Sequence, residues 1–128
     1  MKGRVVHIEG MKFFGEIGNH SIAFDDGKSC ITPVESLFLA MAACTSMDVW
    51  NIMVKKRSGI KNLEVRVEGE REKGYPKVFR KIKLLYIFHG EVEEESCKKA
   101  VELSLSKYCS ISNMIKEVAE IETEIEII

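Results

Sequence analysis

The first third of the chain alternates short runs of apolar and polar residues, with turn-forming residues between them. Extended segments are indicated at Arg4–Ile8, Met11–Phe14 and Ser21–Phe24, because short runs rich in β-branched and aromatic residues favour strands. Gly18–Asn19 and Asp26–Gly27 are dipeptides typical of tight turns. The pattern predicts a small antiparallel meander.

A long helix is predicted directly after the meander. Thr32 can cap its first turn, Pro33 suits the first helical position, and Glu35 stands where a capping box has its acid. The helix is expected to run to about Lys56 and to end at Gly59. Its apolar residues cover nearly every direction around the axis: Leu37, Phe38, Leu39, Ala40, Met41, Ala42, Ala43, Cys44, Met47, Val49, Trp50, Ile52, Met53 and Val54.

A helix that is apolar on all sides is expected to be buried on all sides. One chain of 128 residues is too small to surround such a helix alone. The sequence therefore predicts that a second subunit covers part of it, in an obligate dimer.

The second half of the chain mixes strands and helices. Leu63, Val65 and Val67 alternate with charged residues, and a longer strand is predicted from Val78 to Phe88. The charged segment Glu70–Pro76 is expected to be the tip of a hairpin, and alternate residues of the longer strand share one face: Ile82, Leu84, Tyr86 and Phe88. A second helix opens at Glu91–Glu95, is interrupted at Cys109–Ser112 and resumes to about Ala119. A final strand is indicated by Ile121, Thr123, Ile125 and Ile127. The expected fold is a single α+β domain over residues 1–128, with a long buried central helix packed against antiparallel sheets.

Composition narrows the class of function. The formal net charge is −1, which gives no reason to expect binding to nucleic acid or to an anionic membrane. The first ten residues lack the apolar core of an export signal. The longest apolar run, Leu37–Cys44, is too short to span a bilayer, which needs about 20 residues. A soluble, cytoplasmic protein is expected.

The chain has four cysteines, Cys30, Cys44, Cys97 and Cys109, and none of them forms a C-x-x-C pair. Since the histidines are also scattered, no metal site is expected, and a reducing cytoplasm disfavours structural disulfides. The thiols are therefore either inert packing groups or redox groups. Cys97 suits the apolar face of the second helix, and Cys30 is interpreted as an incidental loop cysteine.

Two of the cysteines fit a two-thiol redox cycle. Cys44 lies among small residues, which leave room for a substrate, and Cys109 precedes a helix that Ser110 or Ser112 could cap. In such a cycle one thiolate attacks a peroxide and becomes a sulfenic acid, and the other thiol then forms a disulfide with it. Plain packing remains the alternative, because free cysteine is among the most buried residue types.

Several motifs resemble the OsmC/Ohr family, from about Gly10 to the C-terminus. They are Pro33-x-Glu35-x-Leu37 leading to Ala42-Ala43-Cys44 and Asp48-Val49, Pro76-Lys77-Val78-Phe79 with Ile82, Ala100-Val101 to Leu103-Ser104, and Lys107-Tyr108-Cys109-Ser110. The resemblance implies an intertwined homodimer with two interfacial active sites. It implies thiol-dependent reduction of organic hydroperoxides, or of hydrogen peroxide, with no resident cofactor and an external dithiol such as a lipoyl group as reductant. Cys44 would be the peroxidatic cysteine and Cys109 the resolving one.

The chain departs from the best-understood members in the groups around the thiol. Those members use an N-terminal arginine, braced by a glutamate after the proline, whereas here the only arginine before Cys44 is Arg4. Glu35 stands one position later and, in a regular helix, lies about 180° around the axis and about 13 Å along it from Cys44. Capping is therefore its favoured role over a supporting role in catalysis. Ser110 replaces a proline that often follows the resolving cysteine.

Asp48 lies one turn after Cys44 on the same helix face. A bare carboxylate there would disfavour the thiolate, so we hypothesise that Asp48 anchors a cation, from the partner subunit for example. The alternative is that it bonds a buried backbone group. For the whole protein, the alternative to a peroxidase is a non-enzymatic relative that binds a small apolar or electrophilic ligand at the dimer interface.

Overall fold

The computed structural model describes all 128 residues, and the chain divides into two compact units, Met1–Phe38 and Leu39–Ile128. Each unit is described by itself. The prediction of a single domain over residues 1–128 stays a prediction.

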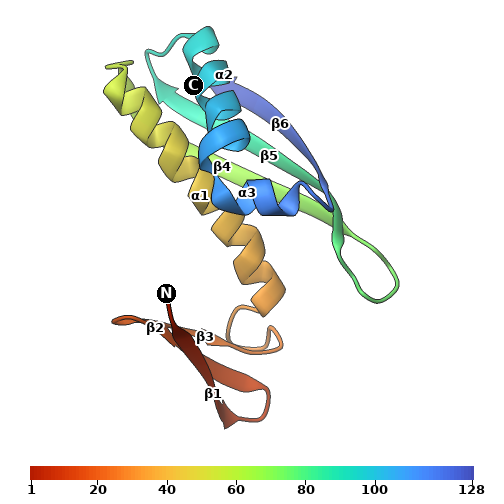
Figure 1. Cartoon of the computed structure of the whole chain (residues 1–128). Helices are drawn as coiled ribbons and strands as arrows, with labels where there is room; N and C mark the ends of the chain where they lie inside the picture. The colour runs from red at the N-terminus through yellow and green to blue at the C-terminus, as the bar shows by residue number, and fades with distance from the viewer. The chain divides into compact units, whose positions relative to one another are not determined.

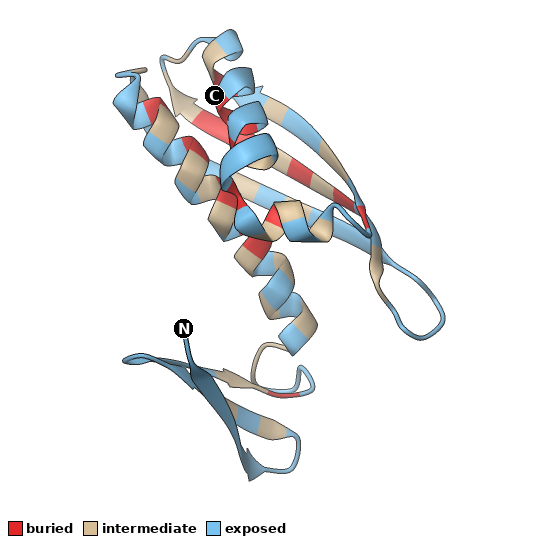
Figure 2. Cartoon of the chain, in the orientation of Figure 1, coloured by how far each residue is buried: buried red, intermediate tan, exposed pale blue.

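The first unit contains the predicted meander (Figure 1). β1 (Gly3–Glu9), β2 (Lys12–Ile17) and β3 (His20–Phe24) pair antiparallel in that order. The turn between β2 and β3 contains Gly18 with a φ of 57°, a conformation that glycine adopts without strain. Every residue of β1 is exposed, and most of this sheet is coloured as exposed in Figure 2.

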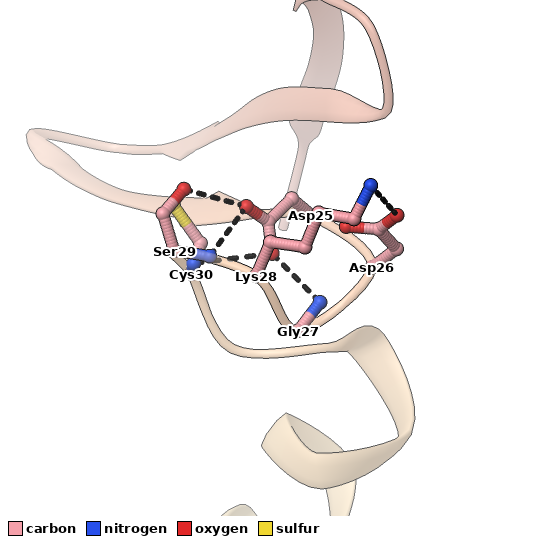
Figure 3. Close-up of polar contacts among 6 residues, drawn as sticks. All are labelled: Asp25, Asp26, Gly27, Lys28, Ser29 and Cys30. Atoms are coloured by element: carbon pink, nitrogen blue, oxygen red, sulfur yellow. Dashed lines mark hydrogen bonds and ion pairs between the residues drawn. The ribbon is translucent and has the colours of Figure 1, made fainter.

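The loop that leads from β3 to the long helix is organised by Asp25 (Figure 3). Oδ1 accepts hydrogen bonds from the backbone N–H groups of Gly27 and Cys30, and Oδ2 accepts from the N–H and the hydroxyl of Ser29. Burial alone would raise the pKa of Asp25, but the Ser29 hydroxyl and the three backbone donors outweigh it and lower the pKa to about 2. The carboxylate therefore holds this loop together.

The predicted capping box begins α1 (Pro33–Lys55). The Thr32 N–H donates to Oε1 of Glu35 at 3.0 Å, and the Glu35 N–H donates to Oγ1 of Thr32 at 3.1 Å. These bonds lower the pKa of Glu35, and the bond from the Thr32 backbone has the larger effect. The capping role of Glu35 is confirmed.

The end of α1 differs from the prediction. Arg57, with a φ of 52°, is the left-handed residue that ends the helix. Its N–H donates to the Val54 carbonyl, and the Ser58 N–H donates to the Met53 carbonyl, which together form a Schellman motif. Gly59 lies two residues beyond this stop, so the expectation that Gly59 ends the helix was wrong.

On length and composition α1 could cross a membrane, because its most apolar 18-residue window has a mean hydropathy of 1.5. The core helix of a soluble protein meets the same test. In the second unit the α1 side chains of Met41, Val49 and Met53 are fully buried, but only 28% of that 18-residue window is buried within the single chain.

The second unit holds a three-stranded sheet in the order β4 (Ile60–Arg71), β5 (Phe79–Gly90), β6 (Glu120–Ile127). β4 and β5 form an antiparallel hairpin, as predicted, but β6 runs parallel to β5. This sheet is therefore mixed and not purely antiparallel. The reason is the helical connection between β5 and β6, which returns the chain to the starting end of β5 before β6 begins.

That connection has three helical parts: α2 (Glu94–Leu103), the π-helix η1 (Ser104–Tyr108) and α3 (Ser110–Ile115). The predicted interruption at Cys109–Ser112 is confined to Cys109, which has extended backbone angles between η1 and α3. α3 ends at Ile115, earlier than the predicted Ala119, and turns lead on to β6.

The core of the second unit forms where α1 and α2 cover one face of the sheet (Figures 1 and 2). Alternate β5 residues fill that face, as predicted, and all are buried: Ile82, Leu84, Tyr86 and Phe88. Other α1 side chains stay open in the single chain, with Met47 73%, Val54 48% and Trp50 39% exposed. One chain thus does not surround α1, which is consistent with the expected dimer.

Candidate active site

Three chemically reactive side chains converge in the second unit. The sulfurs of Cys44 and Cys109 and a carboxylate oxygen of Asp48 all lie within 4.8 Å of one another. Cys44 and Asp48 are one turn apart on α1, and Cys109 comes from the junction of η1 and α3. The two thiols proposed from the sequence therefore meet, although they are 65 positions apart along the chain.

The π-helix and α3 fix the position of Cys109. Its N–H donates to the Ser104 carbonyl at 2.7 Å, and its sulfur accepts from the Ser112 N–H at 3.4 Å. Cys109 is thus itself the N-cap of α3, which corrects the expectation that Ser110 or Ser112 caps this helix. The Ser112 hydroxyl instead donates to the Cys109 carbonyl, as does the Asn113 amide.

The two thiols differ in their access to solvent. Cys109 is fully buried, whereas Cys44 is half-buried. Burial raises the pKa of Cys109, the contact with Ser112 opposes that rise, and the neighbouring Cys44 adds to it. Cys109 is therefore kept as a neutral thiol, and Cys44 is the less buried of the two cysteines.

A chain of buried hydroxyl groups supports Asp48. Tyr86 Oη and Thr45 Oγ1 are 2.8 Å apart, Thr45 Oγ1 and Ser104 Oγ are 2.8 Å apart, and Ser104 Oγ donates to Asp48 Oδ2 at 3.0 Å. Thr45, Ser104 and Tyr86 are all fully buried. Burial strongly raises the pKa of Tyr86, although its bond to Thr45 lowers it in part, so its hydroxyl keeps its proton.

The direction of each bond in this chain follows from counting protons, because each hydroxyl carries one. Ser104 gives its proton to Asp48, so Thr45 must donate to Ser104, and Tyr86 must donate to Thr45. Three hydroxyl dipoles therefore point toward the carboxylate. This Tyr86–Thr45–Ser104–Asp48 series, the hydroxyl chain, holds Asp48 beside the two sulfurs.

The hydroxyl chain was not predicted from the sequence, from which no hydrogen-bond partner was assigned to Tyr86, Thr45 or Ser104. The signal was the presence of Thr45 and Ser104 at positions that helical spacing buries, since buried hydroxyls require partners.

Two roles were considered for Asp48 from the sequence, a hydrogen bond to a buried backbone group and the anchoring of a cation. Its partner is the Ser104 side chain and not a buried backbone group, so that alternative is not observed. No lysine, arginine or histidine of the chain forms an ion pair with Asp48. The cation that Asp48 is expected to anchor stays a prediction.

The other residues considered from the sequence lie elsewhere. Glu35 belongs to the capping box of the first unit. Arg4 pairs with Glu16 across β1 and β2 at 3.0 Å. Cys97 is fully buried in α2, as expected of a packing cysteine, and Cys30 is half-buried in the Asp25 loop.

Two thiols that meet in an α+β fold are what the family resemblance predicted, and the family comparison agrees. The family model of the OsmC-like protein matches residues 25–124, and the chain therefore belongs to the OsmC-like family. It is 32% identical to Protein YhfA of Escherichia coli (strain K12), over 100% of this chain and 98% of that protein.

Solved structures share the fold. A hypothetical protein from Aquifex aeolicus VF5 has a TM-score of 0.93 at 27% identity, over 99% of this chain and 95% of that one. An organic hydroperoxide resistance protein from Legionella pneumophila has a TM-score of 0.74 at 13% identity, over 98% and 95%. The second likeness shows the fold alone.

Proposed function

We propose that this protein is a thiol-dependent peroxidase, in which Cys44 attacks the peroxide and Cys109 resolves the product. The observation that carries the proposal is that one half-buried cysteine lies beside one fully buried cysteine, with their sulfurs within 4.8 Å. A disulfide needs a sulfur–sulfur distance of about 2.05 Å. The two sulfurs thus have to approach by less than about 3 Å, which is within the reach of side-chain rotation and small shifts of the backbone.

The proposed cycle balances in three steps. The Cys44 thiolate attacks one peroxide oxygen, the O–O bond breaks, and the alkoxide leaves as an alcohol after taking up a proton, so that Cys44 becomes a sulfenic acid. Cys109 then attacks the Cys44 sulfur, which releases water and forms the Cys44–Cys109 disulfide. An external dithiol, for which we propose a lipoyl group or a similar thiol, reduces the disulfide and is itself oxidised to a disulfide.

The substrate class comes from the family. Several structures with this fold are named organic hydroperoxide resistance proteins, and we extend that substrate class to this chain, with hydrogen peroxide as the smaller alternative. The buried Cys109 suits the resolving step, because a protected neutral thiol is not itself oxidised by peroxide in solution.

We also propose that the working protein is an intertwined homodimer in the cytoplasm. Met47, Trp50 and Val54 leave one side of α1 open in the single chain, and β1 is exposed along its whole length. Apolar surface of this extent is typical of a protein interface. The cytoplasm is the compartment in which thiols are kept reduced between turnovers.

Mass spectrometry tests the thiol assignment. Reduced protein treated with one equivalent of cumene hydroperoxide should lose two thiols and gain a disulfide between the peptides that contain Cys44 and Cys109. The Cys109→Ser variant should instead accumulate a sulfenic acid at Cys44, trapped with dimedone. Retention of both thiols, or slow oxidation spread over all four cysteines, would favour the non-enzymatic ligand-binding alternative.

A further inference from the structure

The candidate site gathers three groups that can each carry a negative charge and provides no positive charge to balance them. Cys44, Asp48 and Cys109 lie within 4.8 Å of one another, and no cationic side chain of this chain pairs with Asp48. The one hydrogen bond to the Asp48 side chain comes from the neutral Ser104 hydroxyl. Electrostatically, the site suits a cation from outside the chain.

The atoms of the site favour a thiophilic metal ion as that cation. Zinc binds cysteine sulfur at about 2.3 Å and carboxylate oxygen at about 2.0–2.2 Å, and a tetrahedron with these bonds separates its ligands by about 3.5–3.8 Å. The three atoms here lie within 4.8 Å, so each pair needs to close by about 1.3 Å at most. Two sulfurs and one oxygen leave the fourth position open for water or another ligand.

The surroundings of the three atoms are those of a supported metal site. Protein metal ligands are usually held by outer hydrogen bonds that fix their orientation. Here Ser104 donates to Asp48 Oδ2 at 3.0 Å from within the hydroxyl chain, and Oδ1 receives no hydrogen bond. Cys109 is fixed through its sulfur and carbonyl by Ser112. Half-buried Cys44 provides the access route.

We infer that Cys44, Asp48 and Cys109 form a zinc site in the reduced protein, which regulates the peroxidase. No metal site was expected from the sequence because its cysteines and histidines form no close pairs, whereas this site forms only when the fold brings Cys109 to α1. The regulatory part rests on the proposed function. Bound zinc keeps both sulfurs deprotonated but occupies the electron pairs that would attack a peroxide.

Oxidation then releases the metal, because peroxide reacts with the zinc-free protein that is in equilibrium with the zinc-bound form. Overall, one hydroperoxide and two protons convert the zinc-bound pair of thiolates to a disulfide, an alcohol, water and free Zn²⁺. The two sulfurs supply the two electrons that cleave the O–O bond, and zinc stays divalent throughout. A disulfide offers no thiolate, so the oxidised protein loses two of its three ligands.

The test is a titration of reduced full-length protein with zinc chloride against a colorimetric zinc chelator, with Co²⁺ as a spectroscopic probe. We expect one zinc per chain and thiolate-to-cobalt charge-transfer absorption. Cys44→Ser, Cys109→Ser and Asp48→Asn should each weaken zinc binding by more than about 100-fold. Ser104→Ala should weaken it by about 10-fold, as outer hydrogen-bond partners do.

Matched controls separate this site from the other cysteines. Cys30→Ser and Cys97→Ala should each bind one zinc with the affinity of the wild type, and circular dichroism should show that every variant is folded. Absence of zinc uptake by the folded wild type, or equal uptake by the Cys44→Ser variant, would overturn the inference.

A peroxide assay distinguishes failure of the zinc site from failure of the proposed function. Protein treated with a chelator should consume cumene hydroperoxide in the presence of a dithiol, and added zinc should inhibit it reversibly. Consumption of peroxide without zinc binding would leave the peroxidase and remove the metal site. Zinc binding by a protein that consumes no peroxide would keep the site and remove both the peroxidase and its regulation.

Discussion

Two aspartates, one in each unit of this protein, differ in the number and the origin of their hydrogen bonds. Asp25 receives four hydrogen bonds, two on each oxygen, all from its own loop. Asp48 receives one, on Oδ2, from a residue 56 positions away. Asp25 is saturated by short-range contacts, whereas Asp48 is held at one oxygen and keeps the other for something else.

The cysteine near each aspartate follows the same division. Cys30 donates its backbone N–H to Asp25, and no interaction of its thiol is observed. Cys44 presents its sulfur to both Asp48 and Cys109. Asp25, which accepts hydrogen bonds on both oxygens, therefore stabilises the fold. Asp48, which has one oxygen without a hydrogen bond beside two thiols, can bind a further group at the candidate site.

The largest difference should be between the Cys44→Ser variant and the Cys30→Ser variant. Cys44→Ser should lower the rate of cumene hydroperoxide consumption by at least about 10³-fold, because the attacking sulfur is lost. Cys30→Ser should keep the wild-type rate, measured with the same dithiol in the presence of a chelator. Fast turnover by Cys44→Ser would contradict the proposed difference between the two cysteines, since Cys44 would then not be the nucleophile.

The next effect concerns the hydroxyl chain behind Asp48. Thr45→Val keeps the side-chain volume but removes the link between Tyr86 and Ser104, so it should lower the free energy of unfolding by about 2–3 kcal/mol. The single tryptophan, Trp50, reports urea unfolding, at one fixed protein concentration because dimers gain stability with concentration.

A matched double variant tests whether the hydroxyls act as one unit. In Thr45→Val/Tyr86→Phe the buried phenol that lost its acceptor is also removed, so the loss should be smaller than the sum of the two single losses. Strict additivity would show that Tyr86 and Thr45 do not stabilise each other through this bond.

The local elements of both units could be predicted from the sequence, because their signals are local. The meander follows from its turn dipeptides, the start of α1 from Thr32, Pro33 and Glu35, and the buried face of β5 from strict alternation. The end of α1 was misplaced because a left-handed arginine, Arg57, has no sequence signature comparable to glycine.

The candidate site could be predicted only in part. The positions of Cys44 and Cys109 made them candidates for a redox pair, and the family resemblance then assigned their roles, since no periodicity relates residues so far apart in the chain. The hydroxyl chain joins three elements, with 41 positions between Thr45 and Tyr86 and 59 between Thr45 and Ser104. Such contacts depend on how α1, β5 and η1 pack.

A smaller effect should distinguish the two aspartates by pH. The pKa of Asp25 is lowered to about 2, below the value of about 3.9 in an unfolded chain. The ionised carboxylate therefore stabilises the fold above about pH 4, and this contribution is lost as the pH falls from about 4 to about 2. Asp25→Asn should be less stable than the wild type at pH 7, and the difference should shrink across that window.

Asp48→Asn is the comparison for Asp25→Asn. An asparagine carbonyl can still accept the hydrogen bond from Ser104, so Asp48→Asn should lose less stability at pH 7 than Asp25→Asn, where an amide group would face N–H donors. Urea unfolding of metal-free protein at several pH values measures both. Equal losses would contradict the view that Asp25 is structural and Asp48 is not.

The smallest effect should come from the capping box that follows the Asp25 loop. Thr32→Ala should cost about 1 kcal/mol of stability, the usual value for losing an N-cap side chain. Glu35→Gln should cost less than Thr32→Ala, because glutamine also serves at this position of a capping box. Neither change should alter the rate of peroxide consumption by the folded protein. A large loss of rate in Glu35→Gln, with normal unfolding, would show that Glu35 takes part in catalysis and is not only a capping residue.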